Sequence, residues 1–517
     1  MRLRALALVV TTIFSAMPAV VAAADAPAGR SEAPAGQMTW GVHTTLVPTY
    51  FDPAETIIGT SYMMLYGLHD ALVKPLPGQN LAPSLAESWT VSPDGLVYEF
   101  VLRRGARFHN GEPVTAEDAK FSFERYRGVF AKTFKDRVAA LETPDARHFR
   151  VRLKQPWPDF MIYYGMYSAS AGWVVPKKYV EKVGDEGFKK APIGAGPYRF
   201  VSFAPGVELV LEAFDQYWRK TPAVKRLVFR VIPDPSTRLA ALKRGEVDLV
   251  FSVIGELAEE AKRTPGVTLK AVYPSVHWLS FPEQWDPKSP WHDRRVRLAA
   301  NLAIDRRALD QVRTGGLSRI TGNVIPTTAE FYWTPPAPQT DRVRARHLLA
   351  EAGFPNGFDA GDYYCDMTSS DAAEAVLGDL QGVGIRAKLR PLERAAFNKS
   401  VAEKKLKGLV QLIGPGGLGT AARTLEAYVV AGGAFVYGSD PDVDGLFREQ
   451  STMLDRARRE TLLHRIQQLI HDKAMFAPLY ELAFVNGVGP RVAESGLGLI
   501  AGFAFSAPYE DVKLKAR

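Results

Sequence analysis

The stretch of this chain with the clearest chemical potential is the glycine-rich run at residues 409–423, LVQLIGPGGLGTAAR. Gly414, Gly416 and Gly419 have the spacing of the dinucleotide-binding pattern, and the apolar residues before them predict the strand that this pattern requires. Two other interpretations compete with it. The run could be a glycine-rich turn of structural value only, or a loop that faces a ligand in a protein that is not an enzyme.

Motifs of covalent or metal chemistry are missing from the sequence. It has no G-x-S-x-G elbow, no H-E-x-x-H pair and no P-loop. His464 and His471 share a predicted helix, but no other ligands lie near them in the sequence, so a metal site is not expected. Cys365 beside Asp366 is better explained as a partly buried structural thiol than as a soft ligand pair. We therefore expect no enzyme, no metal and no cofactor.

The surroundings of the glycine run do not support a nucleotide site. A Rossmann fingerprint opens its domain, and an acidic ligand for the ribose follows about 20 residues later. This run comes late in the chain, and the acids at a suitable spacing, Asp440 and Asp442, lie in a sequence typical of a turn. The dinucleotide interpretation is therefore rejected, and the run must be judged from the elements around it.

Composition and length describe a globular protein of two or three domains. At 517 residues the chain exceeds the size at which one core stops growing, and 46% hydrophobic with 23% charged residues is ordinary for a globular protein. The formal net charge of +8 comes from interspersed basic and acidic residues rather than from a basic stripe. Nucleic acid is therefore not an expected partner, while a modest positive balance is compatible with anionic ligands.

The N-terminus predicts export from the cytoplasm. Two arginines within the first four residues precede an apolar run at 5–14, and small residues follow through Ala24. This order is typical of a secretory signal peptide, and the apolar run is too short to span a membrane. We expect residues 1–24 to be a cleaved signal and 25–37 a flexible leader. The mature protein would then reside in the periplasm of a Gram-negative bacterium.

The first half of the chain alternates short strand and helix patterns. Residues 97–102 alternate apolar and polar positions directly after the turn sequence Ser92–Gly95, which predicts a β-hairpin. Thr115, with Asp118 three residues later, predicts a capped helix. A strand at 226–231, a helix and a second strand then predict a unit whose two strands are parallel, because the chain crosses over between them.

The second half repeats this alternation. Val343, Leu348 and Leu349 are expected to point inward from one of its helices. Together the patterns predict two α/β lobes with additional small β elements. Helical patterns cover 296–303, 306–312, 341–352, 372–380 and 456–473, and a strand is predicted at 385–389.

A set of short segments extends over much of the chain. They are Leu85–Trp89 with Ser92–Gly95, Arg107–Gly111 with Thr115–Asp118, Pro192–Tyr198, Tyr217–Trp218, Asn301–Arg306, Leu348–Gly353 and Pro355–Gly357. Any one of them alone is a weak signal, but the ordered set is specific. Taken together, they resemble the substrate-binding proteins of ABC importers in the peptide, nickel and opine class, solute-binding protein family five.

The resemblance implies an α/β, bilobal periplasmic-binding-protein fold of type II, cluster C-like, with an extra small α/β domain in lobe one. Lobe one would comprise 38–285 and a return segment at 490–517, with the extra domain at about 73–189, and lobe two would comprise 286–489. Two crossings would form a hinge, and ligand binding would close the cleft. The closed protein, expected to be a monomer, would meet the transmembrane subunits of an ABC permease.

In the resembled family, the glycine run is a strand end that faces the cleft. Peptide-binding members commonly carry a tryptophan there, followed by an aspartate that pairs with the α-amino group of the peptide. This chain has no acid in the run before Glu426, which argues against a standard peptide ligand. Glycine backbone could instead hold an anion and Arg423 a carboxylate, although an exposed helical arginine is an equally weighted alternative. The ligand-binding residues expected here are Gly416, Gly417, Gly419, Thr420 and Arg423.

Aromatic side chains would complete such a pocket. Positions that resemble cleft-facing ones in the family are Tyr62, Phe134, Tyr167 and Tyr437, and for each of them a place in the core is an equally supported alternative. The sequence therefore predicts a periplasmic receptor for a small peptide-like or carboxylate-bearing ligand, such as a short or modified peptide, an opine or an amino-acid conjugate. A secreted hydrolase and a periplasmic peptide chaperone or sensor are the alternatives.

Overall fold

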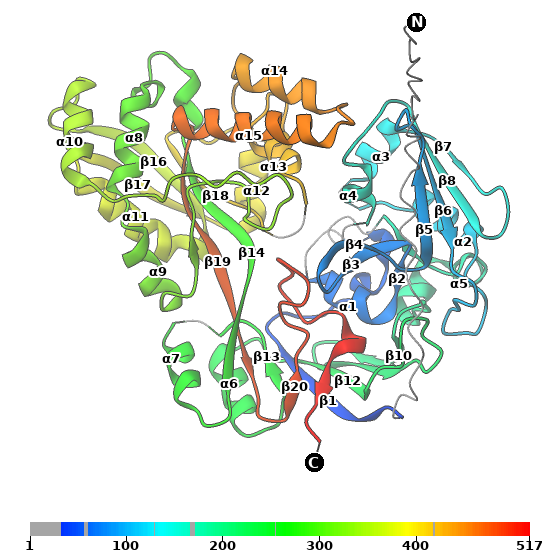
Figure 1. Ribbon diagram of the computed structural model, residues 1–517. Helices are drawn as coiled ribbons and strands as arrows, with labels where there is room; N and C mark the ends of the chain where they lie inside the picture. The colour runs from blue at the N-terminus through cyan, green and yellow to red at the C-terminus, as the bar shows by residue number, and fades with distance from the viewer. Residues whose placement is uncertain are drawn as a thin grey trace, which may run out of the picture.

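The computed structural model describes residues 33–55, 60–128, 130–165, 171–253, 255–416 and 419–516. Two long strands, β14 (Thr268–Ser280) and β19 (Phe476–Val488), join its two groups of elements (Figure 1). We call the elements before β14 and after β19 the first lobe, and those between them the second lobe. The part of the first lobe within residues 73–189 is called the small domain. The predicted signal, 1–24, lies outside the described residues.

A central sheet runs through both lobes. In the described residues it has 11 strands in the order β10–β11–β12–β1–β13–β19–β14–β18–β16–β17, and β15 pairs with β19. Because β14 and β19 are paired with each other along their length, hydrogen-bonded backbone connects the lobes. The other strands are β1 (Ala35–Val42), β10 (Tyr198–Ala204), β11 (Glu208–Ala213), β12 (Val224–Val231), β13 (Leu249–Val250), β15 (Arg319–Ile320), β16 (Phe358–Asp366), β17 (Ile385–Leu392) and β18 (Leu409–Pro415).

The predicted strand–helix–strand unit of the first lobe is present as β12, α6 (Pro235–Lys243) and β13. Asp234 caps α6, because its carboxylate accepts a hydrogen bond from the Thr237 N–H (2.7 Å). The two strands are parallel as predicted, but β1 lies between them and pairs with both. A strand from another part of the sequence has therefore entered the unit, which local patterns cannot reveal. The helix α7 (Glu256–Arg263) follows and packs on β14.

The small domain is built on a four-stranded antiparallel sheet of order β5–β6–β8–β7. The predicted hairpin is confirmed as β5 and β6, and the predicted cap of α2 is confirmed as a reciprocal pair between Thr115 and Asp118. α1 (Ser61–Leu68) and β2 (Asp70–Ala71) come before this domain. Its elements are β3 (Val73–Leu76), β4 (Gln79–Pro83), β5 (Ala86–Val91), β6 (Val97–Leu102), α2 (Ala116–Glu124), α3 (Ala131–Arg137), β7 (Val138–Glu142), β8 (His148–Leu153), α4 (Phe160–Gly165), β9 (Trp173–Val174) and α5 (Lys177–Lys190), whose last residue lies just beyond it.

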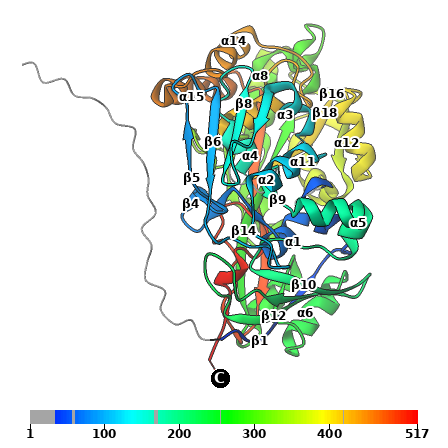
Figure 2. The same ribbon diagram turned by 90° about the vertical axis from the view of Figure 1, so that its right-hand side faces the viewer.

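In the second lobe, helices cover both faces of the sheet. Cys365 belongs to the core under α8–α11, whereas Trp278 belongs to the core under α12–α15. The helices are α8 (Arg294–Ala303), α9 (Arg306–Thr314), α10 (Arg342–Glu351), α11 (Ser370–Gln381), α12 (Arg394–Ala402), α13 (Ala421–Tyr428), α14 (Pro441–Gln450) and α15 (Arg456–Asp472). Figure 2 shows α14 and α8 at one end of the molecule and β12 and α6 at the other.

One prediction about a helix face was wrong. Val343 in α10 is 73% exposed, whereas Ala345 and Leu349 are buried. Residues four apart share one side of a helix, so Ala345 and Leu349 define the inner side and Val343 lies away from it.

At the C-terminus, β20 (Val492–Glu494) pairs with β21 (Lys513–Leu514). None of the described helices is both long and apolar enough to cross a membrane.

Candidate functional site

The predicted glycine run lies at the end of β18, where this strand leaves the sheet. A Cβ on Gly414 would lie 2.4 Å from the Trp278 ring, and a Cβ on Gly416 would lie 2.5 Å from the backbone of Pro274, so neither position accepts a side chain. The Gly416 N–H donates to the Pro274 carbonyl (2.7 Å). Close packing against β14 therefore explains both glycines, and the Gly416 N–H is already used within the sheet.

Thr420, at the end of the run, links the second lobe to the small domain. The Gly419 carbonyl before it accepts a hydrogen bond from the Glu330 N–H (2.7 Å), and Thr420 itself pairs with Glu330 as an isolated bridge. The Thr420 hydroxyl donates to Oδ1 of Asp159 in the small domain (2.8 Å), and both residues are buried. Gly417 lies outside the described residues. The end of the run thus sits where the two parts of the molecule meet.

Arg423 lies in α13 and is half-buried at the same junction. Its guanidinium carbon is 5.4 Å from the centre of the Phe130 ring in the small domain. No carboxylate among the described residues pairs with it. Glu426, three residues later, is already engaged, since it accepts hydrogen bonds from Arg137 (2.8 Å) and from the Tyr163 hydroxyl (2.9 Å). The junction therefore holds one arginine whose charge no described carboxylate neutralises.

The predicted aromatic residues are placed differently from one another. Tyr62 in α1 is 3% exposed and belongs to the core of the first lobe. Phe134 in α3 is 2% exposed and packs edge-on against Phe123 in the core of the small domain. Tyr437 is half-buried against the core of the second lobe. Tyr167 lies outside the described residues. In this structure, core packing accounts for Tyr62 and Phe134.

A pocket beside α13 was not anticipated from the sequence. It has a volume of about 230 Å³ and lies at the carboxyl ends of β16 and β18. Its apolar walls are formed by Phe397, Val401, Leu412, Ile413, Tyr428 and Phe435, and its polar lining by Asp366, Arg394 and Asn398. Carboxyl ends of parallel strands are the usual place for ligands in α/β sheets. The sequence predicted the strand before the glycine run but not its pairing with β16, so it held no direct signal for this pocket.

The electrostatics of this pocket come from one ion pair. Nε of Arg394 donates to Oδ2 of Asp366 (2.8 Å), and the Asp366 carboxylate also accepts from the Thr368 N–H (2.8 Å). Against the opposing effect of burial, which is the largest influence, these hydrogen bonds lower the pKa of Asp366. The pair is therefore charged at neutral pH and neutralises itself, so the pocket has apolar walls on one side and a balanced polar group on the other.

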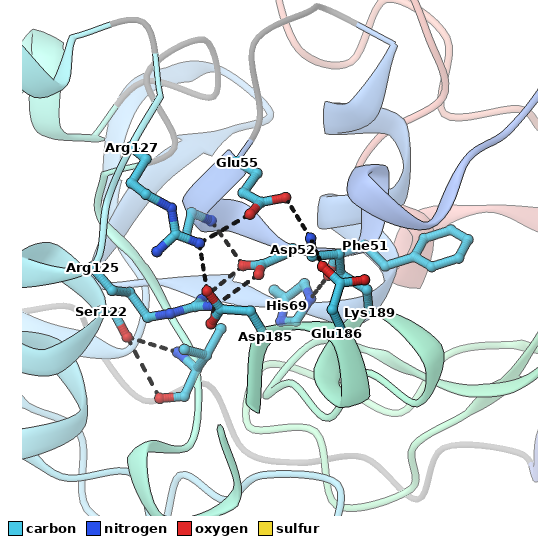
Figure 3. Close-up of polar contacts among 12 residues, drawn as sticks. Phe51, Asp52, Glu55, His69, Ser122, Arg125, Arg127, Asp185, Glu186 and Lys189 are labelled. Carbon is cyan, nitrogen blue, oxygen red and sulfur yellow. Dashed lines mark hydrogen bonds and ion pairs between the residues drawn. The ribbon is translucent and has the colours of Figure 1, made fainter. Parts of the chain in front are cut away.

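A cluster of charges in the first lobe is a competing candidate (Figure 3). Arg125 donates to Asp52 (2.7 and 2.8 Å) and to Asp185 (2.7 Å), and Arg127 donates to Asp185 (2.7 Å) and Glu55 (3.0 Å). The hydrogen bond from Arg125 lowers the pKa of Asp185. Each of these carboxylates is paired within the cluster, which joins η2 (Pro53–Glu55) to α5.

We assign this cluster a structural role. Lys189 of α5 adds a further contact to Glu55 (2.9 Å), and Nε2 of the buried His69 lies 2.8 Å from the Phe51 carbonyl. Burial lowers the pKa of His69 to about 4, so its ring is neutral at pH 7. Among the described residues, no group of three or more acidic, histidine or cysteine side chains is arranged to hold a metal ion.

Curated proteins of similar sequence cover most of the chain. Heme-binding protein A of Haemophilus influenzae is 27% identical over an alignment of 490 residues, and the match covers 87% of this chain and 88% of that protein. Probable di/tripeptide-binding protein 5 of Pseudomonas aeruginosa is 28% identical over an alignment of 479 residues, and the match covers 86% of this chain and 90% of that protein.

Solved structures confirm the predicted α/β periplasmic-binding-protein fold, with additional small antiparallel sheets. HbpA2 from Haemophilus parasuis superposes with a TM-score of 0.80 at 23% identity, over 93% of this chain and 100% of that one. NikA from Brucella suis, in complex with Fe(III)-EDTA, superposes with a TM-score of 0.79 at 21% identity over the same shares.

The family model gives the assignment that sequence reasoning proposed. The model described as "Bacterial extracellular solute-binding proteins, family 5 Middle" matches residues 80–428, well over half of the chain. Proteins of this family bind solutes for ABC transport and do not catalyse reactions, so the prediction of a non-enzyme is confirmed. The chain belongs to the bacterial extracellular solute-binding proteins of family 5.

Proposed function

We propose that this protein is a periplasmic receptor that captures a small carboxylate-bearing, peptide-like ligand between its lobes and delivers it to the transmembrane subunits of an ABC permease. The N-terminal sequence supports export through a signal peptide. Relatives carry names of heme-binding and di/tripeptide-binding proteins, and a protein of the same fold was solved with agropinic acid. Each of these ligands carries at least one carboxylate, which is the group that the proposal places at Arg423.

The proposal rests on the surroundings of Arg423, which include an aromatic ring but no paired carboxylate among the described residues. Its guanidinium lies over the Phe130 ring, and no described carboxylate pairs with it. A guanidinium that stacks on a ring keeps its in-plane N–H donors, and their fork matches the two oxygens of a carboxylate. The half-buried position also excludes part of the water that would weaken such a pair. Arg423 is therefore suited to receive a ligand carboxylate.

The neighbouring acidic side chains favour binding of a ligand carboxylate over binding of a ligand amine. Asp159 already faces Thr420 and Arg459, and Glu426 already faces Arg137. A ligand ammonium would have to displace one of these internal partners, whereas a carboxylate displaces none. The proposed ligand is thus held through its acid group, and its apolar part would enter the recess formed by Phe397, Leu412, Tyr428 and Phe435.

The proposal is tested first by finding a ligand and then by changing Arg423. A thermal-shift screen of di- and tripeptides, opines, heme and metal chelates identifies binders. Calorimetry then compares the wild type with Arg423→Ala and Arg423→Lys. Charge-assisted hydrogen bonds contribute about 1.5–3 kcal/mol, so Arg423→Ala should weaken binding by about 10- to 150-fold, with Lys in between.

Arg307→Ala is the matched control, because Arg307 is an exposed arginine on α9 of the same lobe. It should leave the affinity unchanged. An unchanged affinity in Arg423→Ala would refute the assigned role of Arg423. If the screen finds binders and the bound compound is recovered intact after long incubation, a receptor is supported over a hydrolase.

A further inference from the structure

Asp159 of the small domain makes contacts with the second lobe that the capture of a ligand does not explain. It lies directly before α4, and its carboxylate accepts hydrogen bonds from the Thr420 hydroxyl (2.8 Å) and from Nη2 of Arg459 in α15. These partners are 261 and 300 residues away in the sequence. Figure 1 shows α13 and α15 on the side of the second lobe that faces α3 and α4.

All three residues of this contact are buried. Asp159 is 7% exposed, Thr420 2% and Arg459 4%. Both side-chain partners of the Asp159 carboxylate come from the other lobe. A buried carboxylate without a partner is strongly unfavourable, so Asp159 and Arg459 are compatible with burial only while they face each other. If the lobes separated, water would have to replace these contacts.

The hydroxyl of Thr420 is used in an unusual way. Thr420 occupies the N-cap position of α13, where a threonine side chain ordinarily accepts a hydrogen bond from the first turn of its helix. Within the described residues the Thr420 side chain makes no such capping bond, and its hydroxyl donates to Asp159 instead. The start of α13, and with it Arg423 three residues later, is therefore fixed by a group that belongs to the opposite lobe.

Further contacts reinforce the same junction. The Glu426 carboxylate of α13 accepts hydrogen bonds from Arg137 and from the Tyr163 hydroxyl, which both belong to the small domain. At the tip of the β5–β6 hairpin, a Cβ on Gly95 would lie 2.9 Å from the Leu454 side chain of the second lobe. The small domain and the second lobe thus meet at three places: the hydrogen bonds of Asp159, the hydrogen bonds of Glu426, and the contact of the β5–β6 turn with Leu454.

We propose that Asp159 is a positioning residue that latches the two lobes together and completes the ligand site only in the closed state. In the closed state it orients Thr420, the start of α13 and so the guanidinium of Arg423. In an open state, Thr420 would be released to cap its own helix, and Asp159 and Arg459 would be hydrated. The part of this proposal that concerns Arg423 rests on the proposed function, whereas the latch itself does not.

Part of the free energy that favours the closed form comes from the latch and requires no ligand. Its groups are all supplied by the chain, so the unliganded protein should populate the closed arrangement to a measurable extent. Removing the Asp159 charge should penalise only the closed form, because Arg459 would then be buried without its carboxylate. The equilibrium between the two forms should therefore shift toward the open one.

Small-angle X-ray scattering of the unliganded protein tests the latch without any knowledge of the ligand. Asp159→Asn and Thr420→Val should each increase the radius of gyration relative to the wild type. Thr420→Ser keeps the hydroxyl and should restore the wild-type scattering. Asp145→Asn is the matched control, since Asp145 is an exposed aspartate of the same domain that pairs with His148.

Thermal melting separates opening from misfolding. Thr420→Val should have the melting temperature of Thr420→Ser but a larger radius of gyration. A merely structural role of Thr420 would instead change the melting temperature. If Asp159→Asn fails to fold, the Thr420 pair of variants decides the question. Scattering of folded Thr420→Val that is identical to the wild type would overturn the latch. Because no ligand is present, this result is independent of whether Arg423 binds a carboxylate.

Discussion

Removal of the cation from the buried pair Asp70–Lys74 should destabilise the protein strongly. Both side chains are fully buried, and Nζ of Lys74 lies 2.8 Å from Oδ1 of Asp70. The Asp70 carboxylate also accepts hydrogen bonds from Ser84 Oγ (2.6 Å), the Tyr217 hydroxyl (2.9 Å) and the Trp218 indole (2.6 Å). This centre fixes the beginning of the small domain to the rest of the first lobe.

Lys74→Met keeps most of the side-chain volume but removes the ammonium group, which pairs with Asp70 and also donates to the Tyr217 hydroxyl (3.2 Å). Breaking one partner out of a buried pair typically costs 3–5 kcal/mol, and the neutral donors that stay on Asp70 place the expected loss near the lower end, at about 3 kcal/mol. An unfolding entropy of about 2.1 cal/mol/K per residue amounts to about 1 kcal/mol/K for a chain of this length. The melting temperature should therefore fall by about 3 °C.

Differential scanning calorimetry measures this shift. Lys132→Met is the control, because Lys132 makes the same kind of pair with Asp136 on the surface, where its side chain is 87% exposed. Exposed pairs contribute little, so this variant should melt like the wild type. The reasoning would be refuted if Lys74→Met also melted within 1 °C of the wild type, or if the two variants lost equal stability.

Three further outcomes follow from burial. Because burial lowers the pKa of His69 to about 4 while the unfolded value is about 6.5, its contribution to stability is complete above pH 6.5 and falls by about 2 kcal/mol on acidification to pH 5. His69→Gln should therefore make the loss of melting temperature on acidification smaller, and a change at exposed His347 should not. Burial also lowers the pKa values of His43, His109 and His277, so part of the pH dependence should persist. Leu349→Ala should cost about 2–5 kcal/mol by urea unfolding, whereas Val343→Ser should stay within about 0.5 kcal/mol, since Val343 is 73% exposed. Burial raises the pKa of Cys365 to about 11, so iodoacetamide at pH 8 should modify it only after unfolding, and rapid labelling of the native protein would contradict its buried position.

Local elements were predictable because their determinants are close together in the sequence. The cap of α2 depends on Thr115 and Asp118, three residues apart, and the β5–β6 hairpin depends on the turn between its strands. The ordered family segments added the overall fold, which the solved structures confirm.

The candidate site was less predictable because its geometry depends on distant residues. Only the fold brings Asp159 to Thr420, 261 residues away, so no spacing rule could identify their contact. Gly416 matched an anion-binding pattern, but its N–H donates to the carbonyl of Pro274, which lies in a strand that comes much earlier in the chain. The position of Arg423 beyond the end of β18 was a local feature, and it was anticipated for that reason.

The protein is proposed to hold its ligand by a carboxylate at Arg423. The most direct test is a calorimetric titration of the wild-type protein with the strongest peptide or opine from the screen, offered as the free acid and as the corresponding amide. The amide should bind at least tenfold more weakly, while acetylation of the ligand amine should have a much smaller effect on the affinity. Equal affinity for the acid and the amide would contradict this proposal.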